Sequence, residues 1–186
     1  MINDSVLIVV DMLHDFIDGS LACDNADNAV ENTLQFIEKT RDEDLPVLFI
    51  RDHHPAGHSS FKENGGTWPV HCVAGTHGGE IHEKLQKFVD EDLVFDKGCD
   101  PAVEQYSGFD GVNAAGQSLG EIVSMLEPEN VFVSGIATEF CVRNTAEDLK
   151  KAGFNVILLS DCLAYVSEAG HRKALDEMRA EGIKIR

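Results

Sequence analysis

Basic residues are scarce in this 186-residue chain. It has 15 lysines and arginines against 33 aspartates and glutamates, which gives a formal net charge of −18. A surface this acidic repels the phosphates of nucleic acids and of anionic lipids, so the composition argues against both as partners. The acidic excess carries no information about the fold, and adaptation to the ionic surroundings explains it at least as well as a function does.

Long apolar runs are also missing. No stretch approaches the roughly 20 apolar residues of a membrane-spanning helix, so we expect no membrane span. The segment Met1–Asp4 lacks the basic residues that begin a signal peptide, and Asp11 interrupts the apolar run that follows it. Together these absences favour a cytoplasmic protein.

Paired cysteine motifs are absent as well. The five cysteines are an odd number, and none of them forms a C-x-x-C pair. Cytoplasmic thiols are normally reduced, which leaves at least one of them available for chemistry. The chain contains no internal repeat, linker or low-complexity segment, and its length is typical of one domain. We therefore interpret residues 1–186 as a single domain.

Apolar, β-branched segments alternate with amphipathic ones along the chain. Strands are expected at residues 5–10, 47–50, 93–95, 130–134, 155–160 and 183–185. Helices are expected at residues 28–41, 118–126, 138–152 and 167–180, with Ser167 as the N-cap of the last. This alternation predicts an α/β fold: a parallel, doubly wound sheet with helices on both faces. Residues 52–76 are irregular, and an irregular segment this long in a small domain is usually functional.

Polar side chains lie where the expected strands end. Asp11 follows the first strand, Asp52 the second and Lys97 the third, and Cys141 lies shortly after the turn that ends the fourth. In parallel α/β sheets the carboxyl ends of the strands form one rim, and ligands bind there. The sequence thus predicts that an Asp, a Lys, a Cys and a metal-ligand residue converge on this rim.

Cys141 is the best candidate for a nucleophile. It lies near the beginning of a predicted helix, where the helix N-terminus stabilises a thiolate and the backbone amides can hold an oxyanion. Its position alone also allows a buried structural thiol. Asp11 ends a buried strand, and partial desolvation raises its pKa toward that of a general base, although a cap or turn residue is the alternative. Cys72 and Cys99 are weaker candidates near the pocket.

A metal site is the second hypothesis. Asp52, His54, His58 and His71 lie in or beside the irregular segment, and three imidazoles with one carboxylate are enough to bind a metal ion. The Asp-x-His spacing at a strand end directs alternate side chains to one face, so His53 points away and is left out. A surface loop that happens to be rich in histidine is the alternative.

Four motifs resemble one known family over nearly the whole chain. They are Val9–Phe16 with Gly19–Leu21, Trp68–Thr76, Lys97–Gly98 with Tyr106–Phe109, and Gly135–Ala146. Together they resemble the isochorismatase-like cysteine hydrolases and, within them, the nicotinamidases. Relatives that act on isochorismate lack the metal cluster. The presence of Asp52, His54 and His71 therefore favours the nicotinamidases within the family. Leu13 departs from the pattern, because many relatives have Gln there.

The resemblance implies a role for each of these residues. Asp11 would be the base, Lys97 its partner and Cys141 the nucleophile. A cis peptide between Ile136 and Ala137 is implied, with the amides of Ala137 and Cys141 as the oxyanion hole. The implied substrate-binding residues are Phe16, Leu21, Trp68, Tyr106, Ile136 and Ala137. One divalent ion, expected to be zinc with iron or manganese as alternatives, would be held by Asp52, His54 and His71; the fourth ligand would be His58 or, in its place, Glu63.

The expected activity is hydrolysis of nicotinamide and of pyrazinamide through a cysteine thioester, as part of NAD salvage and pyridine nucleotide biosynthesis. The expected partner is a small-molecule amide, and assembly into a homo-oligomer is left open. Two alternatives remain at this stage. One is a hydrolase of the same family acting on a carbamoyl or maleamate-like compound, and the other is a non-catalytic binder that has kept the fold.

Overall fold

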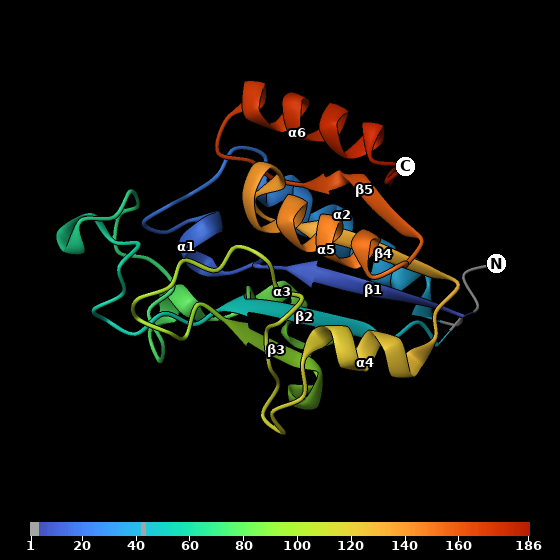
Figure 1. The fold of residues 1–186 in the computed structure, drawn as a ribbon, viewed down its shortest axis with the longest axis horizontal. Coiled ribbons are helices and arrows are strands. Elements are labelled where there is room, and N and C mark those ends of the chain that lie inside the picture. Colours follow the sequence, from blue (N-terminus) through green and yellow to red (C-terminus); the bar gives the residue numbers. More distant parts are fainter. Residues whose placement is uncertain (1–3, 42–43) are drawn as a thin grey trace.

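A single six-stranded sheet forms the centre of the molecule (Figure 1). The computed structural model describes residues 4–41 and 44–186; Met1–Asn3, on which part of the signal-peptide interpretation rested, lie outside this range. The strands are β1 Ser5–Val10, β2 Val47–Asp52, β3 Val94–Lys97, β4 Asn130–Gly135, β5 Val156–Leu163 and β6 Lys184–Ile185. All neighbours in the order β3-β2-β1-β4-β5-β6 are parallel, which confirms the predicted doubly wound α/β fold.

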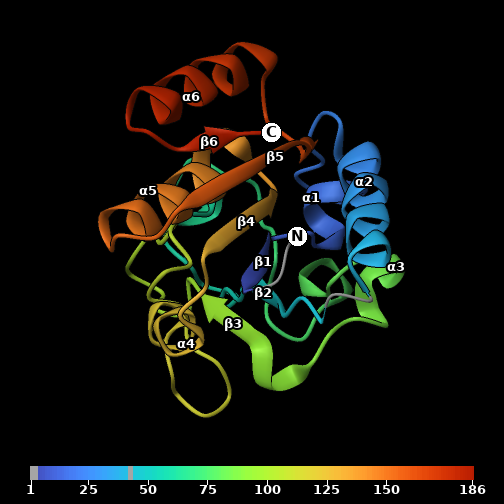
Figure 2. The same cartoon turned by 90° about the vertical axis from the view of Figure 1, so that its right-hand side faces the viewer.

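Helices cover both faces of the sheet. They are α1 His14–Ile17, α2 Ala26–Lys39, α3 Glu83–Gln86, α4 Leu119–Leu126, α5 Arg143–Lys151 and α6 Glu168–Ala180. Single turns are η2 Lys62–Asn64, η3 His77–Gly79 and η4 Glu91–Leu93, and the π-helical turn η5 Thr138–Val142 leads directly into α5. Figure 2 shows α1, α2 and α3 on one side of the sheet and α4 and α5 on the other. Among the residues described, no helix is long and apolar enough to cross a membrane.

The central strand β1 is buried on both faces, as its continuous apolar sequence predicts. Val6, Ile8 and Val10 pack with the helices α4, α5 and α6, whereas Leu7 and Val9 pack with α1, α2 and α3. Successive side chains of a strand point to opposite faces, so one apolar run contributes to two cores. The rigid centre of the sheet then fixes the position of whatever follows β1 and its neighbour β4.

The predicted strands and helices exist, but several of their ends differ. β2 runs on to Asp52, because its polar end residues Arg51 and Asp52 pair with Asp96 and Lys97 of β3. The helix expected at residues 138–152 begins with the turn η5 instead of a regular α-helical turn. Ser167 caps α6 as predicted, since its Oγ accepts the N–H of Gly170 at 3.2 Å.

Candidate active site

Three side chains from separate parts of the sequence meet at the carboxyl end of the sheet. Asp11 follows β1, Lys97 ends β3, and Cys141 lies in η5 directly after β4. The Nζ of Lys97 is 3.0 Å from Oδ2 of Asp11 and 3.4 Å from Sγ of Cys141. All three residues are buried. They lie at the point where the chain leaves β1 for one half of the sheet and β4 for the other, which is where ligands bind in doubly wound folds.

Asp11 is fixed by the neighbouring strand β2. Its backbone has a φ of 48°, and its N–H donates to the carbonyl of Ile50 at 3.0 Å. Its Oδ1 accepts the N–H of Asp52 at 2.9 Å, which leaves Oδ2 facing Lys97. The carboxylate is therefore held by backbone contacts on one side and presents its other oxygen to the reactive group.

Burial sets the protonation of these groups. It raises the pKa of Asp11, the charge of Lys97 opposes the rise, and the pKa settles at about 6. Burial alone would lower the pKa of Lys97, but the charges of Asp11 and Asp52 outweigh it and raise that pKa well above its ordinary value. Burial raises the pKa of the Cys141 thiol well above its ordinary value despite Lys97. The thiol is consequently protonated at rest and needs a base, and Asp11 is within reach of it.

The turn after β4 brings Cys141 against the end of β1. Gly135 has a φ of 131°, and a Cβ there would lie 2.1 Å from the carbonyl oxygen of Val10, so only glycine fits. The peptide between Ile136 and Ala137 is cis, which confirms the feature that the family resemblance implied. The N–H group of Thr138 donates to the carbonyl of Ala164 at 2.9 Å, and that of Val142 donates to the carbonyl of Ala137 at 3.2 Å.

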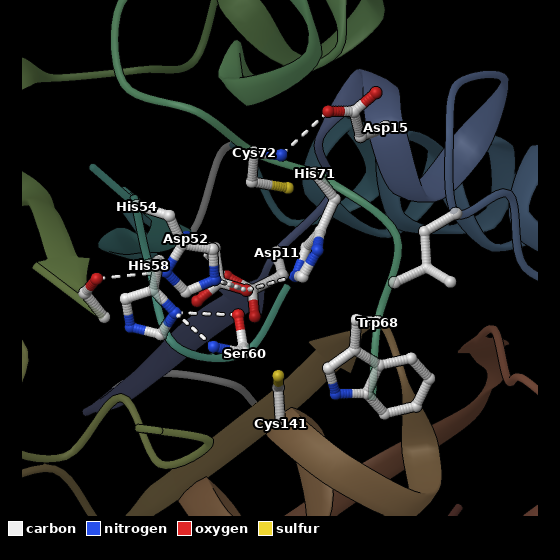
Figure 3. A network of polar contacts seen from close by, with 12 residues as sticks. Asp11, Asp15, Asp52, His54, His58, Ser60, Trp68, His71, Cys72 and Cys141 are labelled. Atoms are coloured by element: carbon white, nitrogen blue, oxygen red, sulfur yellow. Dashed lines mark hydrogen bonds and ion pairs between the residues drawn. The ribbon is translucent and has the colours of Figure 1, made fainter. Parts of the chain in front are cut away.

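Asp52, His54 and His71 form a second group beside the first (Figure 3). Their ligand atoms all lie within 4.8 Å of one another, and the three residues are buried. Oδ2 of Asp52 is 3.4 Å from Nε2 of His54 and 4.0 Å from Nε2 of His71. The other oxygen, Oδ1, accepts a hydrogen bond from Lys97, so Asp52 links the two groups.

The hydrogen bonds of the two histidines leave their Nε2 lone pairs free for a cation. Nδ1 of His54 donates to the carbonyl of Gly98 at 3.0 Å, and Nδ1 of His71 donates to the carbonyl of Pro69 at 2.8 Å. This fixes the tautomer in which Nε2 is the acceptor. Within the part of the chain that the structure describes, Nε2 of His54 is buried without a hydrogen-bond partner. Two imidazoles and a carboxylate converging on one point are a donor set that fits a divalent metal ion.

Two of the proposed ligands do not join this group. His58 uses both ring nitrogens elsewhere, Nδ1 at 2.7 Å from Oγ of Ser60 and Nε2 at 3.1 Å from the carbonyl of Val103, and its ring stacks on that of His54. Glu63, named as its substitute, lies in η2 with its side chain exposed. His53, left out of the set, lies with Nδ1 3.8 Å from Asp96, away from the three ligands.

A cavity lined by aromatic rings opens beside Cys141. The residues that line it are Phe16, Leu21, Cys23, Asp52, Trp68, His71, Glu104, Tyr106, Ala137, Phe140, Cys141 and Val166. The Trp68 ring meets that of Phe140 edge to face at 5.1 Å, and its Nε1 donates to the hydroxyl of Tyr106 at 3.2 Å. The two groups of polar residues thus reach one cavity, Cys141 from one side and Asp52 with His71 from another.

Most of the expected substrate-binding residues line this cavity, with one exception, and four further residues line it as well. Phe16, Leu21, Trp68, Tyr106 and Ala137 are at its wall, whereas Ile136 is fully buried and does not line it. The lining residues that were not expected are Cys23, Glu104, Phe140 and Val166. Phe140 immediately precedes Cys141 in the sequence, and this position is the signal that could have identified it.

The chain is similar to known proteins along nearly its whole length. Residues 5–186 match the family model of the isochorismatase domain. A nicotinamidase/pyrazinamidase of Mycobacterium tuberculosis is 35% identical over 183 residues, which cover 96% of each chain. The crystal structure of a pyrazinamidase of Pyrococcus horikoshii in complex with zinc has a TM-score of 0.89 and 37% identity, over 98% of both chains. PnC1 from L. infantum in complex with nicotinate has a TM-score of 0.85 and 32% identity, over 100% of this chain and 93% of that one.

Proposed function

The chain belongs to the isochorismatase family, and we propose that it is a nicotinamidase that also hydrolyses pyrazinamide, with residues 1–186 as one catalytic domain. One observation carries this proposal: a single aromatic cavity is reached by the Cys141 thiol and by the metal-ligand pair Asp52 and His71. A flat ring with an amide on one side and a nitrogen on the other can address both groups together. The relatives named above, a nicotinamidase/pyrazinamidase and a zinc-bound pyrazinamidase, support this substrate class.

We assign the metal site to Asp52, His54 and His71, and zinc to the site. Zinc in catalytic sites takes three protein ligands and keeps a further position open, and two histidines with a carboxylate are a common set. The zinc in the structure of the Pyrococcus relative favours this ion, although iron and manganese also accept these ligands. When bound, the ion supplies a Lewis-acid contact for the ring nitrogen of the substrate, and so helps to place the amide.

The first half of the reaction forms a thioester on Cys141. The carboxylate of Asp11 accepts the thiol proton while the sulfur attacks the amide carbon, and the carbonyl electron pair moves to the oxygen. The amides of Ala137 and Cys141 hold this oxyanion. Asp11 then donates its proton to the amide nitrogen, the C–N bond breaks, and ammonia leaves. Lys97 stays charged throughout and stabilises the sulfur as it gains negative charge.

The second half releases the acid. Asp11, again a carboxylate, accepts a proton from a water molecule whose oxygen attacks the thioester carbon. The C–S bond breaks, the proton on Asp11 returns to the sulfur of Cys141, and the carboxylic acid is free to leave. Because one carboxylate serves as base and then as acid in each half, a pKa raised by burial from its ordinary value suits both roles.

The two alternatives raised by the sequence are less well supported. A hydrolase of carbamoyl or maleamate-like compounds has no use for a cavity walled by the aromatic rings of Phe16, Trp68 and Phe140. A non-catalytic binder has no use for a buried thiol, ammonium and carboxylate in mutual contact, since burying unneeded charges costs free energy.

An assay of ammonia release tests the proposal. Purified protein with a measured metal content should release ammonia from nicotinamide and from pyrazinamide, and form nicotinate from the former. The same preparation should show little turnover of a carbamoyl compound or of maleamate. Turnover of these linear amides above that of nicotinamide would make the non-pyridine amidase the better assignment.

A further inference from the structure

A second cluster of histidines lies outside the cavity described above. His14 is in α1, His77 in η3, and His82 directly precedes α3. The ring centroids of His14 and His77 are 3.9 Å apart, and those of His14 and His82 are 5.1 Å apart. His14 and His77 line a surface hollow of about 790 Å³, together with the acidic residues Asp18, Glu80, Glu83 and Glu91, which outnumber the one arginine there, Arg51. Imidazoles gathered under carboxylates in this way form a local environment that attracts cations.

Glu83 lies beside two of these histidines, at distances close to those between the ligands of a bound metal ion. Nε2 of His14 is 3.3 Å from Oε2 of Glu83, and Nε2 of His82 is 3.5 Å from the same oxygen. The ligand atoms of all three residues lie within 4.8 Å of one another. Tetrahedral zinc holds nitrogen and oxygen at about 2.0–2.1 Å, which places neighbouring ligand atoms roughly 3.3 Å apart. The three atoms therefore need little movement to enclose an ion.

The surroundings of His14 favour metal binding as well. Its Nδ1 lies 3.2 Å from Oδ1 of Asp18, so the Nδ1–H group donates to this carboxylate and the Nε2 lone pair faces Glu83. An imidazole that binds a metal ion through one ring nitrogen and donates to a carboxylate from the other is a common arrangement. His14 and His82 are buried, whereas the Glu83 side chain is exposed, so an ion can enter from solvent and be held from below.

One contact opposes the arrangement. Nδ1 of His82 accepts the N–H of Lys84 at 3.3 Å, which places the ring proton on Nε2. Metal binding at Nε2 moves that proton to Nδ1 and removes this contact. At 3.3 Å this hydrogen bond is longer than usual and therefore weak. Losing it costs little compared with the free energy gained when two imidazoles bind an ion.

We propose that His14, His82 and Glu83 form a second divalent-cation site, which binds zinc or a similar ion and is separate from Asp52, His54 and His71. Its role is structural, because it lies outside the cavity that contains Cys141. The ion links α1 to the beginning of α3, and so holds the segment between His71 and Glu83 beside the end of β1.

Backbone hydrogen bonds already hold this segment in place. The N–H of His14 donates to the carbonyl of Glu80 at 3.2 Å, and the N–H of His82 donates to the carbonyl of Met12 at 3.0 Å. Asp15 accepts the N–H of Cys72, the residue after His71, at 2.7 Å. An ion at the new site adds a side-chain link to these bonds, so it should protect residues 72–83 from proteolysis and slow their amide exchange.

Zinc titration of the full-length enzyme tests the proposal. The protein is loaded with zinc, dialysed, analysed for metal, and titrated with more zinc in a calorimeter. The wild type should bind two equivalents of zinc in total, and Glu83→Gln should bind one. Glu83→Gln should hydrolyse nicotinamide at the wild-type rate. Asp18→Asn, which removes only the partner of His14, should weaken the second equivalent by roughly 10- to 100-fold. His77→Ala removes a neighbouring imidazole outside the ligand set and should keep both equivalents.

Thermal unfolding gives an independent measurement. Excess zinc should raise the Tm of the wild type and of His77→Ala, and should leave that of Glu83→Gln unchanged, because an ion that binds only the folded state stabilises it. His54→Ala should lose the other equivalent and keep this one. The proposal is overturned if the wild type binds a single equivalent, or if Glu83→Gln binds the second equivalent as tightly as the wild type does.

Discussion

The ammonium nitrogen of Lys97 lies 3.4 Å from the sulfur of Cys141, although 44 residues separate the two in the chain. The contact exists because β3 ends, and η5 begins, at the same rim of the sheet. Lys97 there opposes the effect of burial on the thiol pKa, and it compensates two buried carboxylates. The reactivity of the thiol and the stability of the buried carboxylates thus both depend on Lys97.

Cys141→Ala should abolish ammonia release while the protein stays folded, because no thioester can form without the sulfur. Cys99→Ala is the matched control, since Cys99 is an exposed free thiol and its removal should leave the activity near that of the wild type. Activity assays and circular dichroism of both variants check this. Comparable losses in the two variants would contradict the assignment of the nucleophile.

Lys97→Met should destabilise the fold as well as remove the activity. The substitution leaves Asp11 and Asp52 buried without their cation, and removing one partner of a buried ion pair costs about 3–5 kcal/mol. Urea unfolding measures the loss. Lys87→Ala provides the comparison, because Lys87 pairs with Glu38 on the surface at 2.8 Å, where solvent screens the interaction and little stability should change. If Lys97→Met were as stable as Lys87→Ala, the buried ammonium of Lys97 would contribute no stability to the folded protein.

His54→Ala and His71→Ala should lower the zinc content at the active site and raise KM for nicotinamide strongly. Each change removes one of three ligands, so the ion is poorly held and the ring nitrogen loses its contact. His58→Gln should retain the metal, since both nitrogens of His58 are bonded to Ser60 and Val103. Metal analysis and steady-state kinetics test the set. Loss of metal in His58→Gln equal to that in His54→Ala would place His58 among the ligands.

The order of substrates should follow the position of the ring nitrogen. Nicotinamide and pyrazinamide carry a nitrogen in the same place relative to the amide, so with this nitrogen at the metal the carbonyl carbon lies about 3–3.5 Å from the sulfur of Cys141. Picolinamide and isonicotinamide move the nitrogen by one ring position and misplace the carbonyl, which can cost on the order of a hundredfold in kcat/KM.

Benzamide is the control for this series. It fills the space beside Phe16 and Trp68 as nicotinamide does, but it has no nitrogen to offer the metal. We expect kcat/KM to be highest for nicotinamide, next for pyrazinamide, and far lower for benzamide and the two isomers. Equal turnover of benzamide and nicotinamide would mean that the aromatic wall alone positions the ring, and that the metal is not needed for substrate binding.

The sequence by itself determined the fold class and the origin of the reactive groups. Apolar, β-branched runs separated by amphipathic segments specify a parallel sheet covered by helices, because each run must be buried on both faces. Asp11, Asp52 and Lys97 were predictable as rim residues, since each stands where an apolar run ends. The Asp-x-His spacing at the end of β2 likewise placed Asp52 and His54 together and excluded His53.

Only the tertiary structure decided which side chains meet in the irregular segments. His58 forms hydrogen bonds with Ser60 and Val103. Ile136 is buried and does not line the cavity, whereas Phe140 does. The protonated state of the Cys141 thiol also follows from burial, which outweighs the charge of Lys97.

The second histidine cluster shows the same limit of local sequence. His14 and His82 are far apart in the chain, and the periodicity of neither segment predicts their contact. They meet because the strand-like pairing of Leu13 with Ile81 brings α1 beside α3. Strand and helix patterns are local and can be read along the chain, whereas contacts between loops depend on how distant segments pack, which no short-range spacing encodes.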